Sequence, residues 1–477
     1  MTTAVLWFRR DLRLADNPAL HAALETGRVI PVYIHAPEEE GHSAPGAASR
    51  WWLHHSLAAL DKSLQALGSR LVIRRGPALA ALQTLVAETG ATAVFWNRLY
   101  DPDLIRRDSA VKAALREAGL TVKSFNSRLW HEPWQIANKT GDPYKVFTPF
   151  WKACLAAGLD STPLPPPPSL PQVTTTITSL PLADLQLLPK INWDHSMRQV
   201  WTPGEAGAWQ RLNAFCEHID AYHNRRNRLD QAGSSKLSPH LVFGEISPRQ
   251  IYAHLLASYP HPLDQRGSEH FLRELGWREF AYHLIWHFPQ LTEQPLDQRF
   301  KHMAWRDAPE DLHAWQHGRT GIPIVDAAMR ELWATGWMHN RARMIVASLL
   351  TKNLLLDWRA GAAWFWDTLV DADLANNIAG WQWTAGCGAD AAPYFRIFNP
   401  ILQAEKFDPK GAYIRHWLPE LAKLQGKALY APWEADPARL QAAGILLGKD
   451  YPKPIVDLKT SRERALAAFS KVRPYER

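Results

Sequence analysis

The sequence contains little cysteine and no pattern of metal ligands. Its three cysteines, Cys154, Cys216 and Cys387, are far apart, and none belongs to a CxxC motif or a Cys/His ligand spacing. A disulfide framework is therefore excluded, and we expect a protein of a reducing compartment with no metal site. Catalytic triad motifs are also missing.

Long hydrophobic runs are missing as well. No apolar stretch approaches the roughly 18 residues that a membrane span requires. The hydrophobic stretch near the N-terminus covers only residues 4–8 and is followed by Arg9 and Arg10, which does not fit a signal peptide. We therefore expect a cytoplasmic protein with no membrane partner.

Neither sign of charge dominates, and no classical dinucleotide motif is present. The net charge is +7 and the isoelectric point is about 9.2, which permits nucleic-acid binding without requiring it. The basic excess is spread along the chain, so charge does not locate a binding site. No GxGxxG follows the first predicted strand, which argues against a dinucleotide site there.

The chain is long and rich in tryptophan. Its 477 residues exceed one hydrophobic core, so we expect two domains. The 23 tryptophans are an unusual way to fill a core, and we expect some of them to have a stacking or redox role.

The first part of the chain alternates short apolar runs with helical patterns. Five runs predict strands, at 4–8, 29–34, 71–75, 93–97 and 121–125. The alternation predicts a doubly wound parallel sheet of Rossmann-like type over residues 1–130, which binds ligands beyond the carboxyl ends of its strands. The loop FWNRLYDP follows the fourth strand. It is either part of such a ligand site or a connection in which Asp101 caps the next helix before Pro102.

The remainder of the chain has a different character. Residues 131–200 predict an extended connector between domains, because eight prolines fall within 159–190. Residues 201–477 show helical patterns almost throughout, including two helices joined at Thr335 and Gly336. The predicted fold class is α/β plus all-α.

Three groups of polar and aromatic residues stand out in the helical part. Asp371, Asp373, Asn376 and Asn377 precede two tryptophans, and they favour either a planar ligand with a polar head or a capped helix end. The hydroxyl-rich loop 234–238 lies before a predicted helix, as either a phosphate cradle or an N-cap.

The third group is Glu274, Trp277 and Arg278, which share one face of a predicted helix at i, i+3 and i+4. A carboxylate, an indole and a guanidinium on one face can bind the edge of a base, stack on it and hold a phosphate. The alternative is an ion-paired helix with a tryptophan in the core.

Several longer motifs carry a family resemblance. TGIPIVDAAMREL, GWMHNRARM, DADLANN, GWQW and APYFRIFNP occur in this order, and WFRRDLRLADNPAL lies near the N-terminus. Together they resemble the DNA photolyase and cryptochrome family, closest to class I cyclobutane pyrimidine dimer photolyases. The resemblance implies a helical FAD-binding domain and, in the N-terminal domain, an antenna chromophore that is a folate or a deazaflavin.

The resemblance also assigns roles to individual residues. It implies FAD binding by Tyr222, Ser234, Ser235, Lys236, Leu237, Ser238, Arg278, Asn340, Asp371, Asp373 and Asn377. It implies DNA contacts by Arg226, Glu274, Trp277, Arg278, Asn340, Arg341, Met344, Trp383 and Gln403. For catalysis it implies Glu274 on the lesion, Asn377 beside flavin N5, and an electron-transfer chain of Trp305, Trp358 and Trp381.

The implied activity is light-dependent repair of cyclobutane dimers by an electron from photoexcited reduced FAD, with the dimer flipped out of the DNA. A monomer that binds DNA containing pyrimidine dimers is expected. Two departures from the family pattern, Phe271 for Trp and Ser234 for Thr, are mild.

Other members of the family remain as alternatives. A cryptochrome-type blue-light photoreceptor is disfavoured by Asn377 and by an end at Arg477 without a long tail. A (6-4) photolyase is disfavoured by Asn340, where histidine is expected. A flavoprotein without photochemistry gives Glu274, Trp277 and Met344 no role.

Overall fold

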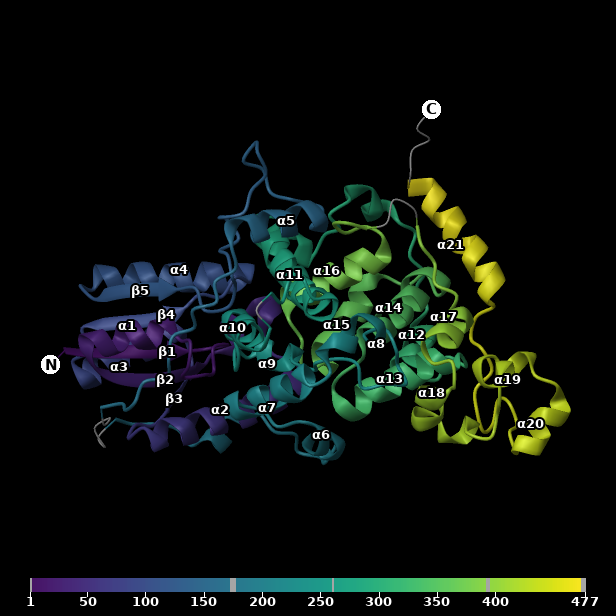
Figure 1. The fold of residues 1–477 in the computed structure, drawn as a ribbon, viewed down its shortest axis with the longest axis horizontal. Coiled ribbons are helices and arrows are strands. Elements are labelled where there is room, and N and C mark those ends of the chain that lie inside the picture. Colours follow the sequence, from purple (N-terminus) through teal and green to yellow (C-terminus); the bar gives the residue numbers. More distant parts are fainter. Residues whose placement is uncertain (1, 172–176, 260, 392–394, 473–477) are drawn as a thin grey trace. The chain divides into compact units, whose positions relative to one another are not determined.

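The computed structural model describes residues 2–171, 177–259, 261–391 and 395–472. It divides into two compact units that interleave along the sequence (Figure 1). The first unit combines Met1–Asp220, Ser235–Pro289 and Val370–Ala375, and the second combines Ala221–Ser234, Gln290–Leu369 and Asn376–Arg477. The division into 1–130, 131–200 and 201–477 stays a prediction. Residues 172–176 of the expected connector and 392–394 of the motif APYFRIFNP lie outside the described residues.

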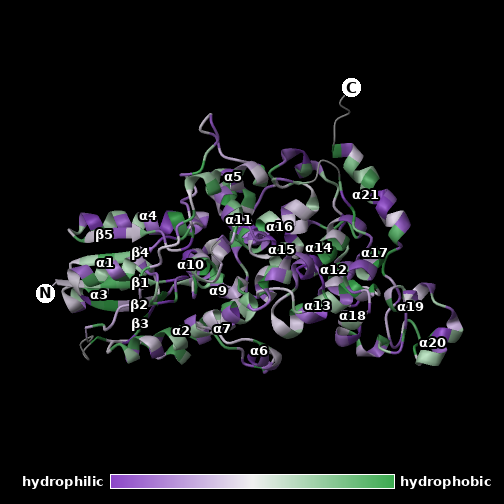
Figure 2. Ribbon diagram, in the orientation of Figure 1, coloured by the Kyte–Doolittle hydropathy of each residue, from purple (hydrophilic) through white to green (hydrophobic). Residues whose placement is uncertain are grey.

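The first unit contains a parallel five-stranded sheet of order β3-β2-β1-β4-β5. Its strands are β1 Thr2–Phe8, β2 Gly27–His35, β3 Val72–Arg75, β4 Ala93–Asn97 and β5 Thr121–Phe125. The predicted doubly wound sheet is confirmed. The central strands are apolar over most of their length, as Figure 2 shows, because a parallel sheet is buried on both faces.

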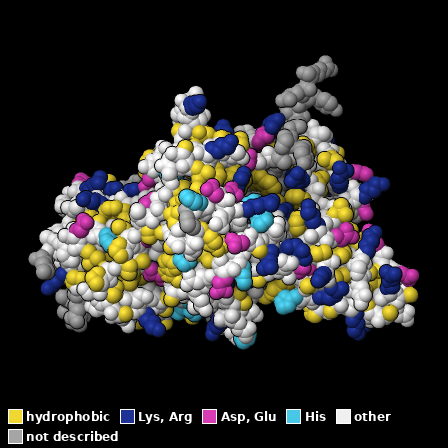
Figure 3. Space-filling view, viewed as in Figure 1, with side chains coloured by type: hydrophobic (Ala, Val, Ile, Leu, Met, Phe, Trp, Pro, Cys, Tyr) yellow, Lys and Arg dark blue, Asp and Glu magenta, His cyan; other side chains and the backbone are white. Residues whose placement is uncertain are grey.

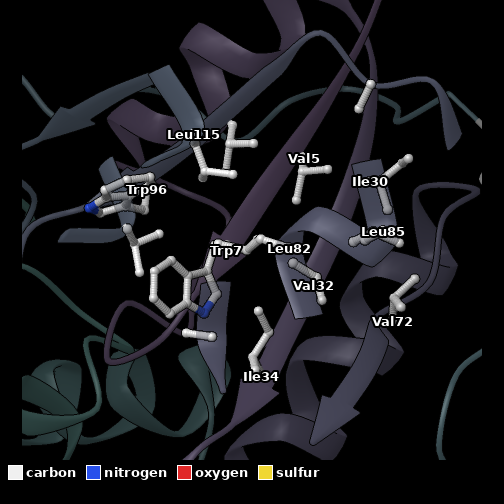
Figure 4. Packing of buried hydrophobic residues seen from close by; sticks show 14 of the residues in the cluster. Val5, Trp7, Ile30, Val32, Ile34, Val72, Leu82, Leu85, Trp96 and Leu115 are labelled. Atoms are coloured by element: carbon white, nitrogen blue, oxygen red, sulfur yellow. The ribbon is translucent and has the colours of Figure 1, made fainter. Parts of the chain in front are cut away.

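One face of the sheet forms a core with helices α3 (Ala78–Thr89) and α4 (Pro102–Glu117). Alternate strand residues such as Val32 and Trp96 meet Leu82 and Leu115 of these helices (Figure 4). Trp7 on β1 lies against Trp96, with ring centroids 5.6 Å apart. Helix α1 (Pro18–Thr26) packs against β1, β2 and β4.

Asp101 occupies the N-cap position of α4, but its side chain makes no capping hydrogen bond. Its Oδ2 instead accepts hydrogen bonds from Ser43 Oγ at 2.8 Å and Arg10 Nη1 at 3.0 Å. Asp101 therefore takes the predicted N-cap position, but its carboxylate binds two partners from other segments and does not cap the helix N–H groups.

Of the other α-helices of the first unit, α2 lies between β2 and β3 and the rest come after β5 in the sequence. They are α2 Ala47–Ala66, α5 Phe147–Ala157, α6 His195–Val200, α7 Glu205–Cys216, α9 Ser238–Val242, α10 Pro248–Ser258 and α11 Arg266–His287. Helices α5 and α11 approach closely at Gly276, where a Cβ atom would lie 2.6 Å from the Trp151 ring. The small residue thus lets α11 pack on the aromatic face of α5.

The second unit is mostly helical. Its helices are α8 Tyr222–Arg225, α12 Pro309–Gln316, α13 Pro323–Thr335, α14 Asn340–Ser348, α15 Trp358–Thr368, α17 Pro400–Phe407, α18 Ala412–Trp417, α19 Lys427–Tyr430, α20 Pro437–Ala443 and α21 Leu458–Val472. Helix α16 (Leu374–Ala385) begins in the first unit and continues in the second. Among the described residues, no helix is long and apolar enough to cross a membrane.

Two glycines fix the packing around α13 to α16. Gly336 ends α13 with a φ of 67°, a left-handed conformation that glycine adopts without strain, so the predicted turn between α13 and α14 is confirmed. At Gly361 on α15, a Cβ atom would lie 2.1 Å from the Trp381 ring. Only glycine therefore allows Trp381 to pack directly against the α15 backbone.

Candidate functional site

A buried polar cluster surrounds Asp373 in the first unit. The Tyr282 phenol donates a short hydrogen bond to Oδ2 of Asp373, and Arg128 Nη2 donates to the phenol oxygen at 2.7 Å. Burial alone lowers the pKa of Arg128, but Tyr282 and Asp373 outweigh it and raise the pKa above its ordinary value. Burial has the opposite effect on Tyr282 and raises the pKa of its phenol. The cluster therefore holds a neutral phenol between a fixed cation and a carboxylate.

Arg278 joins this cluster. Its Nη1 donates to the carbonyl oxygen of Arg128 at 2.8 Å, and its guanidinium carbon lies 5.1 Å from the centroid of the Tyr282 ring. The side chain is 8% exposed, so Arg278 is oriented by the protein before any ligand binds. Arg278 and Asp373, both predicted to bind the cofactor, are thus linked through Tyr282.

The hydroxyl-rich loop meets Asp371. Ser238 Oγ donates to Asp371 Oδ2 at 2.6 Å, while Ser235 Oγ accepts from the Leu237 amide at 3.3 Å. Lys236 has a φ of 53°, a left-handed conformation that is uncommon outside glycine and that turns successive amides toward one side. Helix α9 has no side-chain cap, so the simple N-cap alternative for this loop is wrong.

The face of α11 carries an aromatic stack. The rings of Trp277 and Phe147 are parallel within 9°, with centroids 3.8 Å apart. Trp277 remains partly exposed, as does Glu274 one turn earlier. The predicted indole therefore stacks on a neighbouring ring and remains partly exposed to solvent.

In the second unit, Asn377 and Trp381 lie on successive turns of α16. Nδ2 of Asn377 donates to the carbonyl oxygen of Ala362 at 3.0 Å. The Trp381 ring packs against Phe365 and Trp315, with centroids 5.0 and 6.1 Å away. Trp381 is 3% exposed, and among the described residues its Nε1 has no hydrogen-bond partner.

The other predicted electron-transfer tryptophans differ in burial. Trp358 is 1% exposed at the start of α15, with the guanidinium carbon of Arg359 4.9 Å from its ring centroid. Trp305 lies outside the helices and is partly exposed. Of the three, Trp305 is therefore the one that is partly exposed to solvent.

A cluster of arginines lies near α8 and α14. Arg341 donates from Nη2 to Asn227 Oδ1 at 2.7 Å, and its guanidinium carbon lies 4.4 Å from the Phe407 ring centroid. Burial lowers the pKa of Arg341, and the charges of Arg226 and Arg396 lower it further. The positive charges of these guanidinium groups repel one another, and a bound anion such as a phosphate would stabilise them.

Of the remaining predicted residues, Asn340 and Met344 lie on the predicted second helix, α14. Asn340 is exposed and Met344 is partly exposed on α14. Gln403 is partly exposed on α17, and Trp383 Nε1 donates to the Asp390 carbonyl at 3.1 Å. Tyr222 and Ser234 belong to the second unit, where Tyr222 is 9% exposed and has the Arg226 guanidinium carbon 5.6 Å from its ring centroid.

Positive side chains are spread over the face seen in Figure 3 and are numerous over the helices of the second unit. Within the part of the chain that the structure describes, no group of three or more His, Cys, Asp or Glu side chains could hold a metal ion.

Comparison with known proteins decides the family. Residues 4–170 match the model of DNA photolyase, and residues 271–471 match the model of the FAD binding domain of DNA photolyase. The deoxyribodipyrimidine photo-lyase of Agrobacterium fabrum is 49% identical over 98% of both chains. The chain belongs to the DNA photolyase and cryptochrome family. It is an enzyme of the photolyase type, and FAD is its cofactor.

Two further relatives show the breadth of this family. Cryptochrome-2 of Arabidopsis thaliana is 42% identical over 98% of this chain and 79% of its own length. A crystal structure of a class III photolyase from Agrobacterium tumefaciens has a TM-score of 0.94 and 49% identity, and the match covers 99% of this chain and 98% of that one. The motifs favoured class I, whereas this relative is described as class III.

Several residues of the site were not predicted from the sequence. Tyr282 shares a helix face with Arg278, four residues earlier, and this spacing is a signal that could have identified it. Arg128, Phe147, Trp315 and Phe365 come from distant segments and carry no local signal. Their positions follow only from the fold.

Proposed function

We propose that the protein repairs cyclobutane pyrimidine dimers in DNA with light and FAD. This reaction requires neither a protein nucleophile nor a metal ion. When bound and reduced, FAD supplies the photoexcited electron that splits the dimer. The chain itself must bind the cofactor, orient the lesion and hold the DNA backbone.

The cofactor fits the residues at hand. Ser235, Lys236 and Ser238 offer hydroxyl and amide donors in a loop with a left-handed turn, which suits phosphate oxygens. Arg278 and Asp373 are held in place through Tyr282 for the polar parts of the cofactor.

The orientation of the Asn377 amide is the observation that carries the proposal. Because Nδ2 donates to the Ala362 carbonyl, Oδ1 is the atom that can accept a hydrogen bond from flavin N5. A neutral acceptor there stabilises the reduced cofactor without adding a charge. Reduced FAD is the form that the repair reaction requires.

We assign the binding of the lesion to two partly exposed indoles, those of Trp277 and Trp383. Trp277, braced by Phe147, and Trp383, held by the Asp390 carbonyl, would each pack against a flipped-out dimer. Glu274 lies on the same face of α11 as Trp277 and would accept a hydrogen bond from the edge of a thymine base. Met344 and Asn340 on α14 would contact the same lesion.

The DNA backbone is assigned to the arginine cluster of the second unit. Arg341 is directed by Asn227 and Phe407, and Arg226 stands near enough to lower its pKa. Two phosphates bound by Arg226 and Arg341 would neutralise this repulsion. Gln403 would contribute a neutral contact.

We further propose that the sheet of the first unit carries an antenna chromophore, either a folate or a deazaflavin, and that the protein acts as a cytoplasmic monomer. A blue-light photoreceptor is the second candidate, because cryptochrome-2 is similar over 98% of this chain. Asn377 disfavours it, since plant-type and insect-type sensors tend to have Asp or Cys there.

A repair assay with the full chain tests the proposal. Chemically reduced protein is mixed with an oligonucleotide that carries one thymine dimer, and recovery of thymine absorbance is followed under blue light and in darkness. We expect recovery only in light. No recovery from protein with FAD bound and reduced would overturn the repair function and favour the photoreceptor.

A further inference from the structure

An aromatic ladder in the first unit connects the surface with the Asp373 cluster. The Trp134 ring is 46% exposed and lies 4.7 Å from Trp286, measured between centroids. Trp286 lies 6.4 Å from Tyr100, and Tyr100 lies 5.9 Å from Tyr282. Each step brings two redox-active side chains within ring contact, so no gap interrupts the series.

Both phenols in the ladder have a carboxylate that can take their proton. Tyr100 donates to Glu132 Oε2 at 2.8 Å, and Tyr282 donates to Asp373 Oδ2. Tyr100 and Tyr282 are each 1% exposed, and Glu132 is 5% exposed. Oxidation of a buried tyrosine requires a proton acceptor in hydrogen-bond contact, because the oxidised phenol is a strong acid.

The ladder is not explained by the packing of one helix. Tyr282 and Trp286 are one turn apart on α11, but Tyr100 comes from the loop after β4 and Trp134 from the segment before α5. Arg98 fixes the outer end, since its guanidinium carbon lies 5.9 Å from the Trp134 centroid and its Nε donates to Glu132 at 3.0 Å.

We propose that Trp134, Trp286, Tyr100 and Tyr282 form a second electron relay, which carries electrons from a thiol reductant at the surface to photoexcited oxidised flavin. The relay is separate from Trp305, Trp358 and Trp381, which belong to the second unit. It rests on the proposed function, because it requires a flavin that light excites and that is bound at the cluster of Arg278 and Asp373.

The steps balance as follows. Tyr282 loses one electron to the flavin, and its phenol proton moves to Asp373. Tyr100 then returns an electron to Tyr282, which recovers its proton from Asp373, while the Tyr100 proton moves to Glu132. Trp286 reduces Tyr100, which recovers its proton, and Trp134 reduces Trp286. The external thiol finally reduces Trp134 and is itself oxidised.

The test uses the full chain with oxidised FAD and with Trp381→Phe, which interrupts the other chain. Under blue light and dithiothreitol without oxygen, we expect photoreduction to continue at a reduced rate and to slow in heavy water. Trp134→Phe and Tyr100→Phe in this background should each lower the remaining rate by about tenfold or more. Trp209→Phe is the matched control, because Trp209 is partly exposed in the same unit and its ring contacts His254 instead.

Two readouts do not depend on flavin turnover. Electron paramagnetic resonance of flash-frozen samples should show a tyrosyl signal that narrows when ring-deuterated tyrosine is incorporated. Illumination in air without thiol should hydroxylate Trp134, as mass spectrometry detects, and Tyr100→Phe should prevent this.

The proposal is overturned if Trp381→Phe abolishes photoreduction, if Trp134→Phe and Tyr100→Phe leave the residual rate unchanged, or if no tyrosyl signal forms. Repair by dithionite-reduced Trp134→Phe separates the two proposals. Intact repair with an unchanged photoreduction rate rejects the relay alone, whereas a parent chain that fails to repair rejects the proposed function.

Discussion

Asn377 Nδ2 donates a hydrogen bond to the carbonyl oxygen of Ala362 over 3.0 Å, which joins α16 to α15. The bond also orients the amide, because its oxygen must then face away from that carbonyl. One contact between two helices thus sets the direction of the amide oxygen that we propose as an acceptor for the cofactor.

Asn377→Asp should lower the midpoint potential of bound FAD. A carboxylate has no N–H for the Ala362 carbonyl, and its charge opposes the extra electron density of reduced flavin. Loss of the Asn377–Ala362 hydrogen bond should also lower the free energy of unfolding by about 1 kcal/mol. Spectroelectrochemical titration measures the potential, and Asn376→Asp, one residue earlier, controls for the added charge. An unchanged potential would remove Asn377 from the cofactor site.

Glu274→Ala should lower repair by about tenfold or more, because the lesion loses an acceptor worth more than 1 kcal/mol. FAD content should stay at one per chain, as absorbance of the purified protein shows. Glu269→Ala on the same helix is the control. If Glu274→Ala instead releases FAD, its role is structural.

Arg341→Ala should weaken binding of both damaged and undamaged DNA and reduce the slope of log affinity against log salt by about one. Burial and the nearby arginines lower the pKa of Arg341, so a bound phosphate would stabilise its charge. Fluorescence anisotropy at several salt concentrations gives the slope. Arg439→Ala, at an exposed position on α20, should leave it unchanged, and the same slope in both variants would contradict a phosphate contact.

The sheet could be predicted from the sequence because its five strands are short apolar runs separated by helical stretches. Each of the five predicted runs overlaps an observed strand. The turn at Gly336 was also predictable, since Gly follows the last residue of a periodic helix. These signals depend on residues that are close in sequence, so they can be read without knowing the tertiary structure.

The site could be predicted only in part. Motifs identified Asp373 and Arg278, but the group that links them, Tyr282, is 91 residues from Asp373 and 154 from Arg128. Side chains that meet over such separations leave no pattern in the sequence. Asp101 is a second example. Its position before α4 predicted a local capping bond, but its carboxylate accepts hydrogen bonds from Ser43 and Arg10, which are distant in sequence.

His283 should make the first unit sensitive to acid. Its Nε2 accepts from the Tyr144 amide at 3.0 Å and its Nδ1 contacts the Pro133 carbonyl at 3.2 Å, an arrangement that needs a neutral ring. Burial, and next His287, lower the pKa of His283 to about 4. The unfolded chain binds a proton near pH 6.5, so this contribution to stability is complete above about 6.5 and is lost as pH falls toward 4.

His283→Asn should therefore flatten the dependence of stability on pH between about 6.5 and 4, by up to roughly 3 kcal/mol. Denaturant unfolding at several pH values, compared with the parent chain, measures the difference. His218→Asn, at an exposed position, is the control. Identical slopes for His283→Asn and the parent would show that His283 does not titrate in this range.

Trp381→Phe should slow photoreduction of oxidised FAD by about tenfold or more, because phenylalanine is far harder to oxidise than an indole. The loss should not affect repair by enzyme reduced chemically beforehand, since repair then needs no electron from the protein. Phe365 and Trp315 contact the ring, so the smaller side chain keeps the aromatic packing and FAD content should be retained. Trp315→Phe is the matched control, because Trp315 touches Trp381 but donates its N–H to the Val346 carbonyl at 3.0 Å. Flash photolysis gives the rate, and equal rates for Trp381→Phe and the parent chain would exclude Trp381 as the first donor.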